Sequence, residues 1–474
     1  MDDIFQNLKV LIFGLGLNKG GVGSARFFAS QGAKVRVTDL RSGEILKPSI
    51  SELKDYPQIE YSLDGHKNED INWADLIIKN PAVKPNNPYT EYAKKQGKRV
   101  EQDMGIFLNF VKPSQIIGVT GTKGKSTTTS LIYEVLEKGL SATRGLNVVN
   151  PRGWLASNPR KIVLGGNIGK SVLDIIPDIT PDTLVVLELS SFQLESFEKH
   201  QVSPKWAVIT NITPDHLNYY SGMNEYVAAK RIIGKYQEES DYLFLKKDDL
   251  ITTQPDFLKD LKGQIIYFSK DDLPKTFHPH LKGEHNLENM AAALSVAKIF
   301  GISQAQTLDT IAKFKGVPFR MELIKTWKGV KIINDTTSTS PEAGIQAIKT
   351  ASHIGSSPRS AGGAGGNVVL VCGGMNKGMD YTKYATIVGK LVKKVYFLEG
   401  DSTEEIKKNL SLVTSHLLPA KTYNDLEKLL TDVKKIVESG DTILFSPAAT
   451  SFNLFQNEFD RGRKFNEAVQ KVFK

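Results

Sequence analysis

The segment best suited to chemistry lies at residues 118–130, GVTGTKGKSTTTS. Its Gly-Lys-Ser order is typical of a loop whose backbone N–H groups and lysine hold the phosphates of a nucleotide, with a hydroxyl group for Mg²⁺. The common pattern, G-x-x-x-x-G-K-[ST], would place its first glycine at position 119, where this chain has Val119. The glycines are instead Gly121 and Gly124. The segment predicts a nucleotide-binding loop rather than a glycine turn that merely caps a helix, but with its own glycine spacing.

Three ionisable residues follow in polar segments downstream. Glu188 interrupts the apolar run VVLELSS, and a carboxylate buried there needs a cation, either Mg²⁺ or a basic side chain. His216, in NITPDHLNYY, follows the expected strand 206–213, where a structural role competes with metal binding. Lys230, in YVAAKRIIGKY, lies on an expected helix and by itself would be taken for a solvated lysine.

The last third of the chain places further polar loops after apolar runs. Asp335 opens the hydroxyl-rich loop DTTSTSP, and Lys377 lies in the glycine turn of CGGMNKGMD. Ser446, Thr450 and Ser451 follow the strand-like run before SPAATSF. Each could simply cap a helix, but three such loops on one sheet favour a shared binding face.

The N-terminal stretch that must position its own polar residues reads as strand, turn, helix and strand. Residues 9–13 form the first expected strand, 25–30 lie in a helix, and 35–38 form the second strand, which ends at Asp39. With Gly14 and Gly16 at the turn, this is a βαβ unit of the kind that binds nucleotides. Another strand ends at Asn80-Pro81.

Strands alternate with helices along the rest of the chain, which predicts an α/β fold with mostly parallel sheets. Three domains are expected, at 1–112, 113–316 and 317–474. The expected strands of the second and third domains are 115–121, 183–191, 206–213, 330–336, 367–374, 394–400 and 441–448, with a helix at 126–138. Two turn-rich segments, 139–161 and 355–366, are predicted to be exposed loops.

Composition narrows the class of protein. The 474 residues are 40% hydrophobic and 24% charged, as in ordinary soluble globular proteins, and no run of 18 apolar residues suggests a membrane span. The acidic N-terminus is unlike a signal peptide, and a single cysteine, Cys372, rules out an intramolecular disulfide, so we expect a cytoplasmic protein. The net charge of +9 is spread along the chain, which fits a small polyanionic substrate better than nucleic acid.

Taken in order, these segments resemble the Mur ligases, which add amino acids during peptidoglycan precursor synthesis. The phosphate loop of that family, G-T-x-G-K-[ST], is similar to Gly121-Thr122-Lys123-Gly124-Lys125-Ser126, which accounts for the unusual glycine spacing. Further counterparts cover nearly the whole chain and include GGNIG (165–169), ELSSFQLE (188–195), NITPDHLNYY, AAKR, GEHNLENMAAA (283–293), PFRMEL (318–323), NDTTSTSP, GGMNKGMD and SPAATSFNLFQNEFDRG. Several of these look most like the branch that adds D-glutamate.

The resemblance implies both a fold and a reaction. The fold would comprise an N-terminal Rossmann-like domain that binds UDP rather than NAD, a central P-loop ATPase-like domain and a C-terminal Rossmann-like domain. The reaction would be ATP-dependent ligation of D-glutamate to UDP-N-acetylmuramoyl-L-alanine through an acyl phosphate. The partners would be these three substrates, without nucleic acid or membrane, and the protein would be a monomer.

The resemblance also gives the central residues their roles. Gly121 to Thr127 would bind the ATP phosphates, and two Mg²⁺ ions would be held by Ser126, Glu188, His216 and Lys230. Lys230 would carry a carbamate, which turns a cation that repels Mg²⁺ into an oxygen ligand. Lys125, Lys230, His216 and Glu188 would be the catalytic residues.

The remaining roles fall on all three domains. ATP would also contact Asn286, Asn289, Arg320 and Asp335. The UDP-linked substrate would contact Leu15, Thr38, Asp39, Arg41, Asn80, Pro81 and Asn167. The incoming amino acid would contact Thr339, Lys377, Ser446 and Phe455.

One departure affects the amino acid. The D-glutamate branch commonly has N-D-S-K-A-T-N after the third domain's first strand, and this chain has Thr337 at the lysine position, while Thr339 keeps the threonine. A sibling ligase that adds L-glutamate or another amino acid is therefore an alternative. From other classes, the first βαβ unit alone would suit an NAD-dependent dehydrogenase, and the phosphate loop alone a P-loop NTPase without ligase activity.

Overall fold

A computed structural model describes most of the chain. The described residues are 4–16, 20–81, 83–84, 86–141, 161–168, 171–216, 219–281, 283–354, 366–375, 379–415, 417, 420–451, 454–455 and 457–474. They form two compact units, Met1–Lys315 and Gly316–Lys474, which are considered separately. The first unit holds two sheets and the second holds one.

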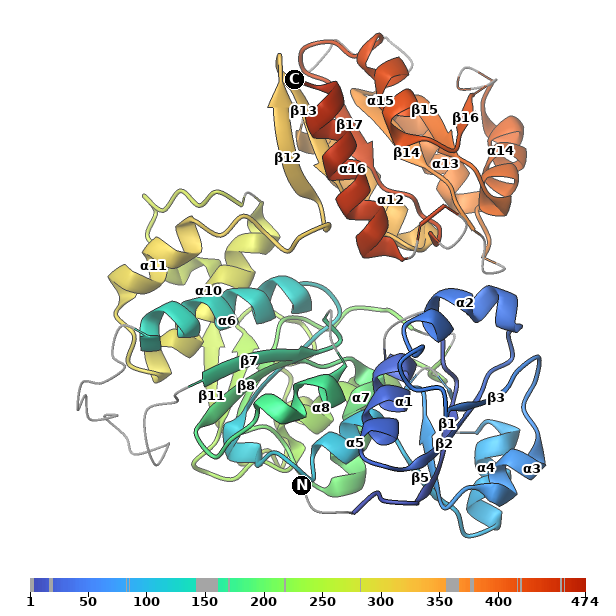
Figure 1. Cartoon of the computed structure of the whole chain (residues 1–474). Coiled ribbons are helices and arrows are strands. Elements are labelled where there is room, and N and C mark those ends of the chain that lie inside the picture. Colours follow the sequence, from blue (N-terminus) through green and yellow to red (C-terminus); the bar gives the residue numbers. More distant parts are fainter. Residues whose placement is uncertain are drawn as a thin grey trace. The chain divides into compact units, whose positions relative to one another are not determined.

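The N-terminal sheet is parallel, with strand order β3-β2-β1-β4-β5 (Figure 1). Its strands are β1 (Lys9–Phe13), β2 (Lys34–Thr38), β3 (Glu60–Ser62), β4 (Leu76–Lys79) and β5 (Arg99–Glu101). Its helices are α1 (Gly20–Ser30), α2 (Gly43–Ser51), α3 (Asn68–Trp73), α4 (Pro88–Lys95) and α5 (Asp103–Phe107). The strand order reverses between β1 and β4, and ligands of open α/β sheets bind at such a reversal, beyond the carboxyl ends of the strands.

The second sheet of the first unit is also parallel, in the order β11-β10-β9-β6-β8-β7. Its strands are β6 (Ile116–Thr120), β7 (Lys161–Gly166), β8 (Thr183–Glu188), β9 (Trp206–Ile209), β10 (Tyr242–Lys246) and β11 (Gln264–Phe268). Its helices are η1 (Pro113–Gln115), α6 (Lys125–Ser141), η2 (Val172–Asp178), α7 (Ser191–His200), α8 (Met223–Lys235), α9 (Pro255–Leu258), η3 (Lys270–Asp272), α10 (Glu284–Ile299) and α11 (Gln304–Ala312). Helices α6 and α10 pack side by side.

The second unit is a six-stranded sheet in the order β12-β13-β17-β14-β15-β16. Its strands are β12 (Glu322–Trp327), β13 (Val330–Asn334), β14 (Val368–Cys372), β15 (Val392–Leu398), β16 (Thr422–Tyr423) and β17 (Thr442–Phe445). Its helices are α12 (Pro341–Ile354), α13 (Thr382–Leu391), α14 (Asp401–Val413), α15 (Leu426–Lys434) and α16 (Glu458–Val472). Only the pairing of β12 with β13 is antiparallel among the described strand pairs of this sheet.

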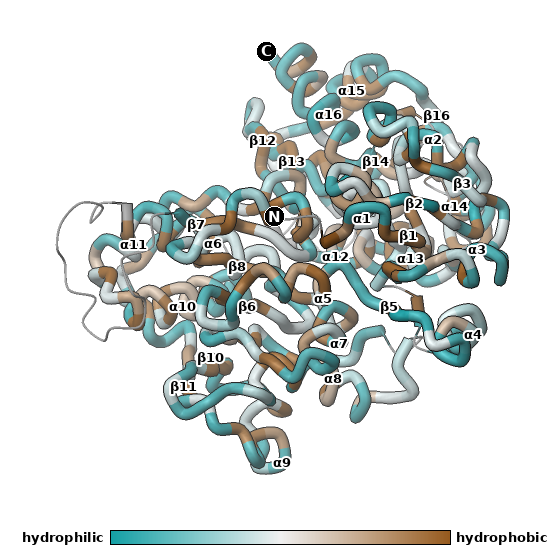
Figure 2. The backbone as a smooth tube through the Cα atoms, turned by 60° about the horizontal axis from the view of Figure 1, so that its bottom comes forward, coloured by the Kyte–Doolittle hydropathy of each residue, from teal (hydrophilic) through white to brown (hydrophobic). Residues whose placement is uncertain are grey.

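Burial explains why the central strands are continuous apolar runs. Every residue of β6, β8, β14 and β17 is buried, as expected where helices cover both faces of a parallel sheet. The helices instead alternate brown and teal stretches in Figure 2, as expected for one buried and one exposed face. In the part of the chain that is described, no helix is both long and apolar enough to cross a membrane.

The α/β fold with mostly parallel sheets is confirmed, and the main differences lie at the strand ends. The strand predicted at 206–213 ends at Ile209, and the one predicted at 183–191 ends at Glu188. After Glu188 the chain turns into α7, whose N-cap Ser190 forms a reciprocal capping box with Gln193. In both cases polar residues leave the ladder to make other contacts. Of the two predicted loops, 142–160 and 355–365 lie outside the described residues.

A buried arginine holds the second unit's helix α16 to two of its loops. Arg461 is fully buried and donates to the Thr336 hydroxyl (2.8 Å), the Thr336 carbonyl (2.8 Å) and the Ala449 carbonyl (3.0 Å). One side chain therefore joins α16 to the loops after β13 and β17. Two of its acceptors are the backbone carbonyl oxygens of Thr336 and Ala449, which would lose this donor if the arginine were removed.

We expect Arg461→Ala to lower the free energy of unfolding of the second unit by about 3 kcal/mol, because the buried acceptors lose their donor. Urea denaturation measures the loss. Arg463→Ala is the matched control, since Arg463 is exposed on the same helix and pairs with Asp460 across one turn. A loss below about 1 kcal/mol for Arg461→Ala, similar to that of a surface residue, would contradict this role.

Candidate functional site

The glycine-rich loop joins β6 to α6 with a geometry that side chains would obstruct. Gly121 has φ +145° and Gly124 has φ +85°, in the region that favours glycine. A Cβ at Gly121 would lie 2.0 Å from the Thr210 hydroxyl, and one at Gly124 would lie 2.3 Å from Asn289 Oδ1. The two glycines are therefore required by close neighbours as well as by the turn. The loop delivers Lys125 and Ser126 to the N-terminus of α6, where backbone N–H groups suit an anion.

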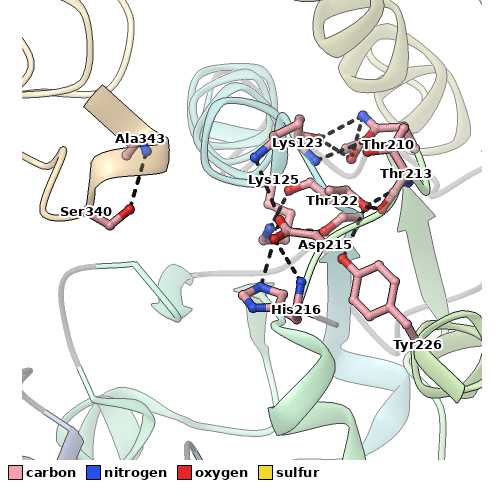
Figure 3. A network of polar contacts seen from close by, with 12 residues as sticks. Thr122, Lys123, Lys125, Thr210, Thr213, Asp215, His216, Tyr226, Ser340 and Ala343 are labelled. Carbon is pink, nitrogen blue, oxygen red and sulfur yellow. Dashed lines mark hydrogen bonds and ion pairs between the residues drawn. The ribbon is translucent and has the colours of Figure 1, made fainter. Parts of the chain in front are cut away.

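The end of β9 clamps this loop from one side (Figure 3). Thr210 Oγ1 donates to the Lys123 carbonyl at 2.6 Å, and Asn211 Nδ2 donates to the same oxygen at 2.9 Å. The Lys123 N–H donates to Asn211 Oδ1 at 3.0 Å, and the Thr122 N–H donates to the Asn211 carbonyl at 2.8 Å. The strand ends at Ile209 because the next two residues, Thr210 and Asn211, form hydrogen bonds with the loop instead of continuing the strand.

Thr122 joins the loop to two further segments. Its hydroxyl contacts the Tyr226 hydroxyl at 3.1 Å and the Thr213 carbonyl at 3.1 Å, and it accepts from the Thr213 N–H at 3.0 Å. Tyr226 lies on α8 and is buried. The loop is thus fixed by contacts within the protein.

Two lysines converge on one backbone carbonyl. Lys125 Nζ donates to the Gly121 carbonyl at 3.0 Å, and Lys230 Nζ donates to the same oxygen at 2.8 Å. Lys230 is buried, contrary to its appearance in the sequence, and its Nζ lies 4.8 Å from the centre of the Tyr226 ring. Burial and the nearby Lys125 charge lower the pKa of Lys230 to about 6, so its amine is largely neutral at pH 7.

Glu188 lies beside the start of the loop, since it pairs with Val119 in the sheet. Its Oε1 accepts from Asn167 Nδ2 at 2.9 Å, while its Oε2 is buried and has no hydrogen-bond partner among the described residues. A buried, half-satisfied carboxylate fits a bound cation. Within the same residues, no three His, Cys, Asp or Glu side chains group as a metal site, so a metal here would also need Ser126 and a modified Lys230, as the sequence predicts.

His216 is held in a left-handed backbone conformation, φ +53°, in the loop that follows β9. Its side chain is 44% exposed, and its ring stands edge-on to Phe192 at 5.1 Å. Its Nε2 lies 4.0 Å from Asp215 Oδ2, and Figure 3 shows the two side chains facing each other. Burial lowers the pKa of His216, and the charges of Lys125, Lys230 and Lys123 lower it further against the opposing effect of Asp215. A neutral imidazole suits a metal ligand. Its ligand role stays a prediction.

Asn286 and Asn289 lie on α10, which packs against α6. Asn289 Oδ1 accepts from Thr128 at 3.1 Å and touches Gly124, while Asn289 Nδ2 contacts Asn286 at 3.4 Å. The pair therefore lies against the phosphate loop and the first turn of α6. Its predicted contact with ATP is consistent with that place.

The predicted UDP residues gather at the carboxyl edge of the N-terminal sheet. Asp39 is buried and accepts from the N–H groups of Gly16 (2.9 Å) and Arg41 (3.0 Å), so it shapes the turns on either side. Thr38 bonds to His66 Nδ1 at 2.9 Å, and the His66 ring stacks on Phe13. The other predicted residues at this edge are Leu15, which is buried, and Asn80 and Pro81, which follow β4.

In the second unit, Asp335 and Ser446 meet because β13 and β17 are neighbours. Ser446 Oγ donates to Asp335 Oδ2 at 3.0 Å, and the Met321 N–H donates to Asp335 Oδ1 at 3.0 Å. Burial raises the pKa of Asp335 to about 7. Exposed Arg320 lies between Phe319 and Met321, which both have positive φ, so Asp335 helps to hold a strained turn that presents the arginine.

Of the residues predicted to contact the incoming amino acid, the structure describes Thr339, Ser446 and Phe455. The Thr337 hydroxyl donates to the Phe319 carbonyl at 3.0 Å, so this side chain serves the same strained turn. Thr339 is half-buried, and Phe455 lies 5.6 Å below the ammonium of Lys464. Lys377 lies outside the described residues, and its role stays a prediction.

Several residues that shape the site were not predicted from the sequence, namely His66, Phe192, Thr210, Asn211, Thr213 and Tyr226. Thr210, Asn211 and Thr213 form the polar end of an apolar run, a signal that could have been used. Tyr226 precedes Lys230 by about one helical turn, so its position near that lysine could also have been predicted from the sequence.

Comparisons with known proteins agree with the geometry. Family models match residues 8–102 (Mur ligase MurD-like, N-terminal domain), 119–278 (Mur ligase middle domain) and 319–449 (Mur ligase, glutamate ligase domain). The UDP-N-acetylmuramoylalanine–D-glutamate ligase of Roseiflexus sp. (strain RS-1) is 33% identical over 491 residues, 98% of each chain. That of Borreliella afzelii (strain PKo) is 32% identical over 492 residues, 99% of each chain.

A solved structure shares the fold. The UDP-N-acetylmuramate-alanine ligase of Thermotoga maritima gives a TM-score of 0.56 at 20% identity, over 98% of this chain and 99% of that chain. At that identity the likeness concerns the fold alone.

The raised pKa of Asp335 predicts a pH-dependent stability. Its folded pKa of about 7 exceeds the value of 3.8 for a free side chain, so its contribution is complete below pH 3.8 and is lost as pH rises to 7. We expect the free energy of unfolding of the wild type, relative to Asp335→Asn, to fall between pH 4 and pH 7. Urea denaturation at several pH values measures it.

Asp380→Asn is the control, because hydrogen bonds from Thr382 lower the pKa of exposed Asp380 and move its window below pH 3.8. Its difference from the wild type should be flat over the same range. A flat difference for Asp335→Asn as well would show that Asp335 is ionised throughout.

Proposed function

Because the chain belongs to the Mur ligase family of ATP-dependent ligases, we propose that it joins D-glutamate to UDP-N-acetylmuramoyl-L-alanine. The observation that carries the proposal is the pre-formed loop at Gly121–Ser126, on which two lysines and the N-terminus of α6 converge. Family membership excludes the two other classes that the sequence left open, a dehydrogenase and an NTPase without ligase activity.

The choice of substrates draws on the relatives. Two relatives named for this activity are 32–33% identical to this chain over at least 98% of both chains, and the N-terminal residues match the MurD-like family model. The carboxyl edge of the N-terminal sheet, with Thr38, Asp39, Arg41 and Asn80, would bind the UDP group. Asn167, which donates a hydrogen bond to the proposed metal ligand Glu188, would contact the muramoyl end of the substrate.

The central domain would carry the phosphoryl transfer. Lys125, Ser126 and Thr127 would bind the ATP phosphates, and the terminal carboxylate of the UDP-linked substrate would attack the γ-phosphate to give an acyl phosphate and ADP. The amino group of glutamate would then attack the acyl carbon, and phosphate would leave from the tetrahedral intermediate. Lys125 would neutralise charge as it develops on the transferred oxygens. The loop needs no rearrangement, because Thr122 and Asn211 already fix it.

Mg²⁺ would fit the residues present. Glu188 has a buried free oxygen, His216 has a lowered pKa, and Ser126 stands at the start of α6. When bound, the metal would neutralise phosphate oxygens and orient them. A carbamate on Lys230 would add a further oxygen, which makes two ions reasonable.

The surroundings of Lys230 favour that carbamate. Only a neutral amine attacks CO₂, forming an N–C bond and releasing one proton, and the pKa of Lys230 is lowered to about 6. The product would be an anion beside Lys125, so the two side chains would attract rather than repel each other, and its oxygens could serve as metal ligands.

Amino-acid choice is the finer question. The family's lysine would be replaced by Thr337, whose hydroxyl is engaged with the Phe319 carbonyl. Charge for the glutamate side chain would then come from another group, with Lys377 as the sequence candidate. A sibling ligase for L-glutamate is the alternative, favoured by the same threonine.

The test is phosphate release and product mass from purified protein with UDP-N-acetylmuramoyl-L-alanine, ATP and one amino acid at a time. We expect a product with D-glutamate and none with L-glutamate. Product only with L-glutamate would establish the sibling ligase. No product with any amino acid would refute the proposed function.

In the same assay Lys125→Ala should lower kcat by about 10²–10³, because a charge aimed at the transferred phosphate is lost. Lys138→Ala is the control, since Lys138 is exposed on the same helix and pairs with Glu134. Ligation by Lys125→Ala at the wild-type rate would remove the phosphate loop from the reaction.

Carbamylation gives a separate prediction. Protein incubated with ¹³C-bicarbonate and Mg²⁺ should show one carbamate carbon signal in its NMR spectrum that is lost in Lys230→Met. Lys235→Met should keep the signal, since Lys235 is exposed at the end of α8 and pairs with Glu198. A signal that survives Lys230→Met would assign the carbamate elsewhere.

A further inference from the structure

Helix α7 connects the N-terminal domain to the central site through one carboxylate. Glu195 accepts three hydrogen bonds: from Lys79 Nζ at 3.2 Å, from Gln102 Nε2 at 3.1 Å and from the Tyr219 hydroxyl at 2.8 Å. Lys79 and Gln102 belong to the N-terminal domain, and Tyr219 belongs to the loop after β9. None of the roles given above to the site residues involves Glu195.

On the N-terminal side, the contact reaches the place where the UDP-linked substrate is proposed to bind. Lys79 is the last residue of β4, directly before Asn80 and Pro81, and its Nζ also donates to the Val83 carbonyl at 3.1 Å. Gln102, the N-cap of α5, donates in addition to the Phe192 carbonyl at 3.1 Å. Lys79 and Gln102 therefore both donate hydrogen bonds to acceptors on α7.

On the central side, the contact reaches the loop that carries His216. The N–H of Tyr219 donates to the His216 carbonyl at 2.9 Å, and the Tyr219 ring lies 4.4 Å from Phe192. Phe192 in turn stands 5.1 Å from the His216 ring. Glu195 and Phe192, three residues apart on α7, thus hold the histidine loop from one helix face.

We propose that Glu195 is a positioning residue that fixes the carboxyl edge of the N-terminal sheet against the His216 loop, and so sets how the UDP-linked substrate meets the ATP site. This inference rests on the proposed function. Glu195 would act through its contacts with Lys79 and Tyr219. Because a misplacement of about 1 Å in a reacting group can cost a hundredfold in rate, a joint of this kind affects catalysis more than its energy suggests.

The charge of Glu195 matters as well as its oxygens. The Lys79 side chain is 11% exposed and that of Glu195 is 25% exposed, so the pair is largely shielded from water. In Glu195→Gln only one oxygen remains as an acceptor. If the NH₂ group faces Lys79 and Gln102, two donors lose their acceptor; if it faces Tyr219, the hydroxyl must accept a hydrogen bond instead of donating one. The Lys79 charge also loses its counter-ion.

The test compares Glu195→Gln with Glu198→Gln. Glu198 is on the same helix and also pairs with a lysine, Lys235, but within the central domain. With the wild type shown to be active, Glu195→Gln should raise KM for the UDP-linked substrate about tenfold and lower kcat about tenfold or more. The affinity for ATP should stay within twofold, and Glu198→Gln should leave all three values within twofold.

Two more variants separate positioning from stability. Tyr219→Phe, which loses only one hydroxyl, should lower kcat with little change in melting temperature. Lys79→Met combined with Glu195→Gln should recover much of the melting temperature that Glu195→Gln loses, because no buried charge is left alone, yet keep the high KM.

Three outcomes would overturn the inference while leaving the proposed function intact: an unchanged KM for the UDP-linked substrate in Glu195→Gln, an equal loss of ATP affinity, or a KM that recovers together with the melting temperature in the double variant. An inactive wild type would instead refute the proposed function itself.

Discussion

Two lysine side chains, Lys125 and Lys230, donate to one backbone acceptor, the Gly121 carbonyl, and the mutual repulsion that they would have as two ammonium groups governs the central site. Repulsion from Lys125 adds to burial in lowering the pKa of Lys230, so the protein holds the pair at an energetic cost. Anions would relieve that cost, namely a phosphate at the N-terminus of α6 and the proposed carbamate on Lys230. Both would suit a site that carries out a reaction of charged groups.

The charge is useful only because the frame around it is rigid. Gly121 and Gly124 approach Thr210 and Asn289 so closely that no side chain could replace their hydrogens. The loop cannot shift without moving the end of β9, and β9 is a central strand of its sheet. Preorganisation of this kind spares the reaction the cost of reordering donors. A substitution at Asn211 or Thr213 would therefore affect the proposed phosphate binding through the backbone of the loop.

The sequence predicted the order of the elements and the glycine-rich loop better than it predicted the contacts between distant segments. The order of strands and helices followed from apolar runs, and the phosphate loop from Gly124-Lys125-Ser126, because both signals are local. The burial of Lys230 was not predictable from its segment, since its neighbours on α8 are mixed and only the fold places it beside Gly121. The joint at Glu195 was equally hidden: its partners Lys79, Gln102 and Tyr219 are distant in sequence, and only the packing of α7 brings them together.

The second unit shows how one position can change without loss of the surrounding geometry. Asp335 and Thr337 both hold the turn at Phe319–Met321, one through a carboxylate and the other through a hydroxyl. A lysine at position 337 could not donate from the same place, because its ammonium lies several bonds further out. The threonine therefore bonds the loop after β13 to the Phe319 carbonyl through both its N–H and its hydroxyl, and it carries no charge. The Ser446 hydroxyl donates its hydrogen to Asp335, so it would have none left for the carboxylate of a bound amino acid. If Asp335 is protonated, it can donate to Ser446 instead, and the Ser446 hydroxyl could then donate to that carboxylate. The raised pKa of Asp335, about 7, permits this protonation.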